Sequence, residues 1–397
     1  MPNLNGTSQT FSKFAGDSKL PTPFYLYDLE AMAGRAGKFK ALLPKNAHVH
    51  YAMKANAHPE LLKLFCGLGF GVDVVSAGEM TRALECGFKP DQIIFSGVGK
   101  TVTEIRAALA ANIEQINIES LQELKRVGEE AQKLKATARV ALRMNPDIAV
   151  DTHPYIRTGF RDNKFGLDFT AVAEAIEIVK NAAGHLKLQG LTLHIGSQIR
   201  DVEPFRAAII KTLELRHEFS KHNIEIETFD VGGGLGIDYF SADLAQDEKI
   251  LEGYAAVLRE VFLDSGVPKI FLEPGRFLTA RFGVLVSEVQ YVKPTPFKKF
   301  VIVDTGMHHL IRPALYEAFH RIELVRESKA TPELYDVVGP ICESSDVLGF
   351  ERVLPNDIKA GDRVVICDAG AYGSVMASDY NLRGKPGEYF IQNGNIK

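Results

Sequence analysis

The sequence predicts an α/β part followed by an all-β part: a (β/α)8 barrel and a second, C-terminal β-barrel or β-sandwich domain. Three observations support this prediction. Eight apolar strand-like runs alternate with helix-like stretches over roughly 230 residues, close to the usual size of such a barrel. After Gly275, strand-like runs follow one another with few helices between them. Polar residues also recur where the strand-like runs of the first part end, and those ends carry the chemistry in a (β/α)8 barrel.

The strands of the first part are expected from short apolar runs, and its helices from apolar residues at a spacing of three to four. A doubly wound open sheet is the alternative, but eight nearly even units favour closure. The expected strands are 48–53, 71–75, 92–95, 114–118, 139–144, 189–194, 227–231 and 269–273, and the clearest helices are 77–86, 121–134, 205–219 and 254–262.

The second part is expected to contain the strands 283–293, 298–305, 321–326, 335–338, 363–368 and 388–391. The N-terminal run 24–27 precedes the barrel and is expected to join this β domain. The predicted domains are therefore 33–276 and 1–32 together with 277–397.

Composition indicates an ordinary globular protein. Of the 397 residues, 46% are apolar and 24% are charged, and the net charge of −4 gives no sign of nucleic-acid or membrane binding. Cys66, Cys86, Cys342 and Cys367 show no paired spacing typical of a metal or redox motif, which favours a reducing compartment. The N-terminal residues do not resemble a signal peptide, and no apolar run reaches the ~18 residues of a membrane span. We expect a cytoplasmic protein.

Lys54 is the most informative single residue, because it ends the first strand-like run of the barrel. A lysine at the end of a buried strand can lose solvation, which lowers its pKa and makes it a nucleophile able to form a Schiff base. A solvated lysine is the alternative for this residue alone. Further polar groups at the strand ends point to one shared site: Asp73, Ser76, Ser96, Asn117, Glu119, Arg143, Asn145 and the segments 194–198, 232–236 and 273–276.

The glycine run Gly232-Gly233-Gly234 follows the seventh strand, and its backbone N–H groups are expected to approach an anion, as barrels often bind phosphate there. A tight turn without a ligand is the alternative. Glu273 ends the eighth strand and needs a partner, either Arg276 in an ion pair or a protonated heteroaromatic nitrogen. His194 is either a core histidine or a residue that stacks on a flat ring. The histidines show no zinc spacing, and no metal is expected. Together these groups describe a pyridoxal-phosphate site.

Five motifs resemble the fold-type III pyridoxal-phosphate decarboxylases, in particular the branch that acts on diaminopimelate. They occur in the expected order over residues 24–383. They are YAMKAN (51–56), HIGSQ (194–198), GGG (232–234), EPGR (273–276) and CESSD (342–346).

The resemblance implies a role for each matching residue. Lys54 would form the Schiff base, His194 would stack on the ring, and Glu273 would contact the ring nitrogen. Arg312 and Tyr316 would hold the distal carboxylate of the substrate. Cys342 would act as an acid and Glu343 would bind the distal ammonium, both in the site of a partner subunit, so the active unit would be a homodimer. Asp73 is also expected at the cofactor, and the residues expected around its phosphate are Ser197, Gly233, Gly234, Gly275, Arg276 and Tyr372, of which Arg276 and Tyr372 would also lie near the substrate.

The resemblance implies decarboxylation of meso-2,6-diaminopimelate to L-lysine and CO2, the last step of lysine biosynthesis. Decarboxylation of another basic amino acid or of carboxynorspermidine is the alternative, followed by a non-catalytic homologue and a cofactor-free Schiff-base aldolase. An alanine racemase is disfavoured, because an arginine contacts the ring nitrogen in that family. Two departures stand out: Ser345 replaces a more usual glycine, and the sequence ends at 392–397 without an arginine-rich tail. The loop 147–166 has a composition that would suit a mobile segment.

Overall fold

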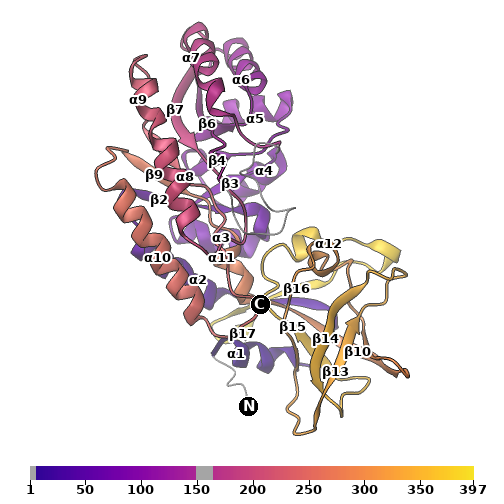
Figure 1. The fold of residues 1–397 in the computed structure, drawn as a ribbon. Helices are drawn as coiled ribbons and strands as arrows, with labels where there is room; N and C mark the ends of the chain where they lie inside the picture. The colour runs from indigo at the N-terminus through magenta and orange to yellow at the C-terminus, as the bar shows by residue number, and fades with distance from the viewer. Residues whose placement is uncertain (1–5, 149–163) are drawn as a thin grey trace. The chain divides into compact units, whose positions relative to one another are not determined.

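The computed structural model describes residues 6–148 and 164–397. The chain forms two compact units that interleave along the sequence (Figure 1). We call Ala36–Gly236 with Asp247–Gly275 the barrel unit, and Met1–Arg35 with Ile237–Gln246 and Arg276–Lys397 the β unit. The domain limits expected from the sequence stay a prediction.

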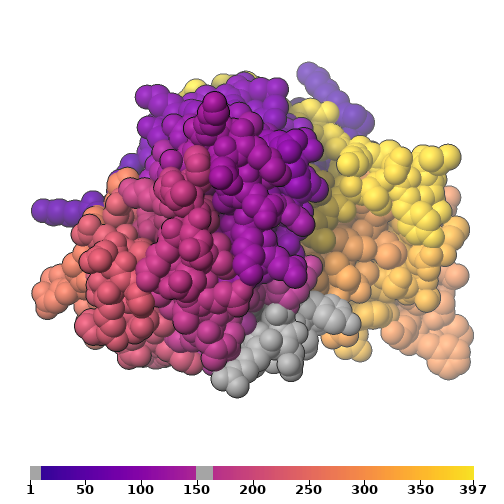
Figure 2. Space-filling model, turned by 90° about the horizontal axis from the view of Figure 1, so that it is seen from above, coloured from indigo at the N-terminus to yellow at the C-terminus, as the bar shows by residue number. Residues whose placement is uncertain are grey.

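The barrel unit is a closed barrel of eight parallel strands, as predicted. The last strand returns to the first, with Ala47 opposite Ile270 and Val49 opposite Leu272. Successive segments, coloured from indigo to magenta, follow one another around its surface (Figure 2). The strands are β2 (Ala47–Ala52), β3 (Gly71–Val74), β4 (Ile93–Phe95), β5 (Gln115–Ile118), β6 (Ala138–Arg143), β7 (Leu186–Thr192), β8 (Thr228–Asp230) and β9 (Lys269–Leu272).

Helices connect most of these strands, and serine caps in the sequence mark where two of the helices begin. Ser76 and Ser120 directly follow β3 and β5, and their hydroxyls accept the backbone N–H groups of Glu79 and Glu123, both at 3.1 Å. Each serine therefore caps the N-terminus of the helix that follows its strand. The helices are α2 (Leu29–Leu42), α3 (Pro59–Gly67), α4 (Ala77–Glu85), α5 (Val102–Ala111), α6 (Leu121–Lys133), α7 (Val172–Asn181), α8 (Glu203–Leu213), α9 (Leu215–Ser220) and α10 (Ala245–Phe262).

A polar layer inside the barrel lies below the site. The Gln115 amide donates to Asn117 Oδ1 at 2.8 Å, and its oxygen accepts the Thr228 hydroxyl at 2.8 Å. A Cβ on Gly190 would lie 2.0 Å from that hydroxyl oxygen, so only glycine fits there. The layer therefore fixes the side chain of Asn117 from beneath.

The β unit contains a nine-stranded sheet in which β1 (Phe24–Asp28) lies between β10 (Gly283–Pro294) and β16 (Gly387–Gln392). The N-terminal strand thus joins the C-terminal β part, as expected. Helix α1 (Gly6–Ala15) contributes Phe11 and Ala15 to the apolar core of this unit. The other strands are β11 (Lys299–Val303), β12 (Ile322–Leu324), β13 (Pro332–Val338), β14 (Val347–Pro355), β15 (Arg363–Ile366) and β17 (Asn395–Ile396), and α12 (Arg312–Tyr316) is a short helix.

Several local predictions were wrong or incomplete. The expected helix 205–219 is divided into α8 and α9, and the expected helix 254–262 is the second half of α10. Strands β14 and β17 and helix α1 were not predicted. Strand β14 was not predicted because it lies at the edge of the sheet. Its second half mixes buried and exposed residues and contains no apolar run. No helix in the described part of the chain is long and apolar enough to cross a membrane.

Candidate active site

Lys54 lies at the carboxyl end of β2, in the short turn η1 (Met53–Ala55). Its Nζ is 3.0 Å from Oδ2 of Asp73, and its side chain is one-third exposed whereas that of Asp73 is fully buried. The pairing of the strands explains this contact, because Ala52 lies opposite Asp73 in the β2–β3 register. The amine is therefore fixed at the mouth of the barrel but still reachable.

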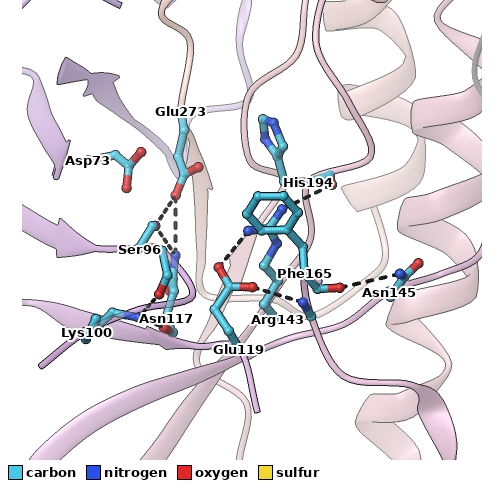
Figure 3. Close-up of polar contacts among 12 residues, drawn as sticks. Asp73, Ser96, Lys100, Asn117, Glu119, Arg143, Asn145, Phe165, His194 and Glu273 are labelled. Carbon is cyan, nitrogen blue, oxygen red and sulfur yellow. Dashed lines mark hydrogen bonds and ion pairs between the residues drawn. The ribbon is translucent and has the colours of Figure 1, made fainter. Parts of the chain in front are cut away.

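Glu273 follows β9 and accepts hydrogen bonds on Oε1 from Ser96 Oγ at 3.4 Å and Asn117 Nδ2 at 3.3 Å. Burial, followed by the charges of Asp230 and Asp73, raises the pKa of Glu273 well above its usual value. Figure 3 shows Glu273 directed toward Ser96 and Asn117, and it also shows Asp73, which lies on β3. The carboxyl group thus points into the barrel mouth.

His194 lies after β7, and its Nδ1 accepts the backbone N–H of Gly233 at 3.1 Å. Burial, followed by the charge of Arg143, lowers the pKa of this imidazole well below its usual value, so the ring is neutral near pH 7. Two positions of the glycine run have no room for a side chain. A Cβ on Gly233 would lie 2.3 Å from the Glu273 carbonyl oxygen, and one on Gly234 would lie 2.5 Å from the Gly196 carbonyl oxygen. The backbone passes too close to its neighbours for any side chain.

A cavity of about 180 Å³ at the barrel mouth brings several of these groups together. Arg143 Nη1 donates to Glu119 Oε1 at 2.7 Å, and its guanidinium lies 4.8 Å from the centre of the Phe165 ring (Figure 3). Glu119 also accepts the Gly166 N–H at 2.9 Å, which fixes Phe165 as a wall. The cavity is lined by Lys54, Val75, Ser96, Gly97, Asn117, Arg143, Phe165, Thr192, His194 and Glu273.

Two other predicted cofactor residues belong to this unit. Ser197 lies in the loop after β7, and Gly275 lies just beyond Glu273. A Cβ on Gly275 would lie 2.9 Å from the Ala55 Cβ, so the residue allows close packing beneath the Lys54 turn. Most of the loop 147–166, expected to be mobile, lies outside the described residues.

The β unit gathers a second set of predicted residues around two buried arginines. Arg276 Nη1 donates to the Tyr239 hydroxyl at 2.8 Å, and its guanidinium lies 4.8 Å from the centre of the Tyr372 ring. Arg312 Nη1 is 2.7 Å from His320 Nε2, and its guanidinium lies 4.7 Å from the centre of the Tyr239 ring. Tyr316 ends the same short helix, α12, that begins with Arg312.

His320 holds Arg312 in one orientation. Its Nδ1 is 2.7 Å from the carbonyl oxygen of Cys367, so Nδ1 carries the proton and Nε2 accepts from Arg312. Burial, followed by the charge of Arg312, lowers the pKa of His320 well below its usual value. The imidazole is a neutral acceptor.

Cys342 and Glu343 lie on an exposed loop of the β unit. The Cys342 N–H donates to Asn381 Oδ1 at 3.3 Å, and Glu343 Oε1 accepts the Tyr380 hydroxyl at 2.6 Å. The buried Asp346 carboxylate anchors the loop by accepting the N–H of Ile341 at 2.7 Å. Ser345 is exposed, with its Oγ 3.7 Å from Met307 Sδ and a backbone outside the left-handed region, so the turn does not need a glycine.

Sequence reasoning missed three residues that the structure places against the predicted ones: Asp230 beside Glu273, Tyr239 between the two arginines, and His320 behind Arg312. Asp230 lies next to the last residue of the expected strand 227–231, so it carries the same signal, a polar residue at a strand end, as the predicted site residues. Tyr239 and His320 lie in irregular segments where no periodic pattern marks them.

Comparison with known proteins defines the class. The family model described as "Pyridoxal-dependent decarboxylase, pyridoxal binding domain" matches residues 29–280. The chain belongs to this family, and its barrel is the pyridoxal-binding part.

Within the family, similar relatives carry one particular name. The diaminopimelate decarboxylase of Aquifex aeolicus is 39% identical over 95% of this chain and 88% of its own length. That of Neisseria meningitidis serogroup A is 41% identical over 95% of this chain and 91% of its own length. The crystal structure of diaminopimelate decarboxylase from Helicobacter pylori complexed with L-lysine matches with a TM-score of 0.89 at 39% identity, over 95% of this chain and 93% of that one.

The barrel residues fit pyridoxal phosphate. The cavity offers a reachable amine at Lys54, a buried carboxyl at Glu273 and a neutral ring at His194. A Schiff-base cofactor with a basic ring nitrogen requires an amine and an acidic partner.

Proposed function

We propose that this protein decarboxylates meso-2,6-diaminopimelate to L-lysine and CO2. The observation that carries the proposal is Arg312. It is buried, and its hydrogen bonds within the described residues go to no carboxylate. A buried guanidinium needs an anion, and an arginine is shaped for bidentate contact with a carboxylate. A substrate with a second carboxylate, distant from the reacting carbon, supplies that anion.

The barrel residues would hold the cofactor. Lys54 would bind its aldehyde carbon, Glu273 would accept a hydrogen bond from its ring nitrogen, and His194 would stack on its ring. Asp73 would stabilise the positive charge at Lys54. Bound pyridoxal phosphate supplies the electron sink for the pair released when the bond between Cα and the carboxylate breaks. The phosphate ligands would be Ser197, Gly233, Gly234, Gly275, Arg276 and Tyr372.

The remaining residues would orient the substrate and return a proton. Arg312 and Tyr316 would bind the distal carboxylate, with Arg276 and Tyr372 nearby, and Glu343 would bind the distal ammonium. The Cys342 thiol would donate the proton that replaces the lost carboxylate at Cα. Cys342 and Glu343 are exposed within their own chain, which supports the proposal that they serve the site of a second copy in a homodimer.

Other substrates fit less well. Ornithine and arginine carry only a cation at the far end, which would leave Arg312 without an anion. Carboxynorspermidine has a carboxylate only at the reacting carbon. A lysine decarboxylase from Selenomonas ruminantium shares the fold with a TM-score of 0.83 at 24% identity. We also place the protein in the cytoplasm, which its four free cysteines support.

The direct test is to incubate the pyridoxal-phosphate-loaded protein with meso-diaminopimelate and to measure L-lysine and CO2. We expect both products in equal amounts, and none with Lys54→Ala. L-Ornithine, L-arginine and carboxynorspermidine serve as competing substrates. Faster turnover of any of these would replace the proposed substrate, whereas a protein that stays colourless after loading and dialysis would remove the cofactor role itself.

A further inference from the structure

Asp230 and Glu273 form a buried pair of carboxyl groups inside the barrel mouth. Asp230 ends β8 opposite Phe271 of β9, and Glu273 lies two residues beyond Phe271, so both carboxyl groups lie at the same end of two neighbouring strands. After burial, the charge of Asp230 is the largest cause that raises the pKa of Glu273. Asp230 is fully buried and Glu273 is 5% exposed. Asp230 Oδ1 accepts the Gly232 N–H at 2.8 Å, while its buried Oδ2 accepts no hydrogen bond from any described group.

The charges around the pair do not allow both groups to ionise. Asp73 on β3 adds a third buried carboxyl, and the one nearby ammonium, that of Lys54, is already 3.0 Å from Asp73. The other groups that face the pair are neutral: Ser96, Asn117, the Gly232 N–H and the Tyr254 hydroxyl on α10. Two adjacent carboxylates without a cation of their own retain one proton between them.

The geometry points to Asp230 as the holder of a shared proton that keeps Glu273 ionised toward the pyridine ring. Only an ionised Glu273 gives a protonated ring nitrogen a charge-assisted hydrogen bond. The proton that the pair retains then sits on Asp230 Oδ2, whose hydroxyl donates to Glu273. No proton enters or leaves the pair in this exchange. Asp230 is thus a positioning residue that acts through Glu273, and the inference rests on the pyridoxal-binding role of the barrel rather than on the amino acid decarboxylated.

Asp73 is not suited to this role. It already accepts from Lys54, and a proton on it would remove the stabilisation of that ammonium. Burial raises the pKa of Asp230 to about 6 and that of Glu273 well above its usual value, so Glu273 holds the retained proton more tightly while no cation faces it. A protonated ring nitrogen favours ionised Glu273 and leaves the proton to Asp230.

The test uses infrared spectra of the cofactor-loaded protein, because a protonated carboxyl group has a carbonyl band that shifts in D2O. The wild type minus Asp230→Asn difference spectrum is expected to contain one such band at neutral pH. Asp247→Asn, which changes another fully buried aspartate of the barrel unit, is the control and should leave the band in place. The proposal is overturned if the wild type minus Asp230→Asn spectrum lacks this band. The band is then either absent from the wild type or still present in the variant.

Cofactor affinity gives a second readout. Asp230→Asn keeps an N–H donor toward Glu273 and should bind pyridoxal phosphate within a few-fold of the wild type. Asp230→Ala leaves a buried carboxylate without its donor and should bind roughly ten- to a hundredfold more weakly. Equal affinities of the Ala and Asn variants would also contradict the proposal.

These outcomes are separable from the proposed function. A wild type that releases lysine but lacks the band refutes the shared proton alone. If Asp230→Ala does not fold, the infrared spectrum of Asp230→Asn still tests whether Asp230 holds the proton. A wild type that never binds pyridoxal phosphate refutes the cofactor role and, with it, the ring nitrogen toward which the proposal keeps Glu273 ionised.

Discussion

The two units of this molecule bury opposite charges in their functional clusters. At the barrel mouth Asp73, Asp230 and Glu273 are buried in addition to the Glu119–Arg143 ion pair, whereas the cluster of predicted residues in the β unit contains the buried Arg276 and Arg312. Charged groups of one sign are costly to bury unless a ligand or partner completes them. The barrel cluster suits the cationic parts of the chemistry, an iminium and a pyridinium, and the arginine cluster suits carboxylate or phosphate. Under the proposed function, each unit would therefore recognise a different part of the bound molecules.

The largest predicted effect comes from removing the amine on the acidic side. Lys54→Ala should lose the visible absorbance of the bound cofactor, and kcat should fall by roughly 10⁴- to 10⁶-fold, as expected for loss of a nucleophile. Lys63→Ala, on the exposed surface of α3, is the control and should behave like the wild type. A Lys54→Ala protein with the absorbance and turnover of the wild type would remove Lys54 from the proposed chemistry.

Cys342→Ala changes neither charged cluster, so it tests proton return alone. The variant should keep the cofactor absorbance, while kcat falls by about 10²–10⁴-fold because a positioned acid is missing. Steady-state release of CO2 at saturating substrate is the measurement, with Cys66→Ala as the matched thiol control. Normal turnover would exclude Cys342 as the acid.

The pH dependence of stability tests the carboxyl-rich side without any cofactor. Burial raises the folded-state pKa of Asp230 from 3.8 to about 6, so the folded protein holds this proton more tightly than the unfolded chain does. The resulting stability is fully present below about pH 4 and is lost as the pH rises through about 6. The rise in pKa corresponds to on the order of 2–3 kcal/mol. Urea unfolding of the cofactor-free protein from pH 4 to pH 8 should show this slope for the wild type and a smaller slope for Asp230→Asn, in which burial still raises the pKa of Glu273. Equal slopes would contradict the prediction.

Arg312→Ala tests the basic side. It should lower kcat/KM for meso-diaminopimelate by about 10–100-fold, because a charge-assisted hydrogen bond to the substrate is lost, and should leave the cofactor absorbance unchanged. Arg312→Lys keeps the positive charge but loses the planar guanidinium. Its kcat/KM should lie between those of the wild type and Arg312→Ala. An unchanged KM in the Ala variant would mean that the distal carboxylate binds elsewhere.

The smallest effect is expected at His320, which touches Arg312. His320→Phe removes a neutral acceptor and should raise KM about 2- to 10-fold with little change in kcat. His320→Gln, which restores an acceptor oxygen, should recover most of the loss. Because the pKa of His320 is lowered, we expect the ratio of wild-type to His320→Phe KM to stay constant between pH 6 and 8. A ratio that changes across this range would show that the imidazole titrates.

The barrel could be predicted almost strand by strand because its signal is repetitive. Each strand is a short apolar run, and each is followed by a polar end. Strand β14 and helix α1 carry no such repeat, since one lies at a sheet edge and the other packs only part of its surface into the core. The sequence pattern therefore predicts the strands of the barrel better than the edge strand β14 or the helix α1.

Within the site, strand ends were predictable and the supporting contacts were not. Lys54, His194 and Glu273 stand out because a charged or polar residue interrupts an apolar run. Asp230 interrupts one in the same way, yet its meaning depends on Glu273, which is 43 residues away and adjacent only through strand pairing. His320 is significant only because Arg312 happens to face it, a relation that no spacing encodes.

The position of β1 imposes an order on biosynthesis. Phe24 pairs with Val286 on one side and with Gly387 on the other, so the strand is made among the first residues of the chain and finds its last neighbour only near the end. The barrel strands, by contrast, pair mostly with the next strand along the chain and can assemble while translation continues. During that interval Phe24-Tyr25-Leu26-Tyr27 would be an apolar segment without partners. The sheet of the β unit therefore cannot be completed around β1 until the last part of the chain has been made.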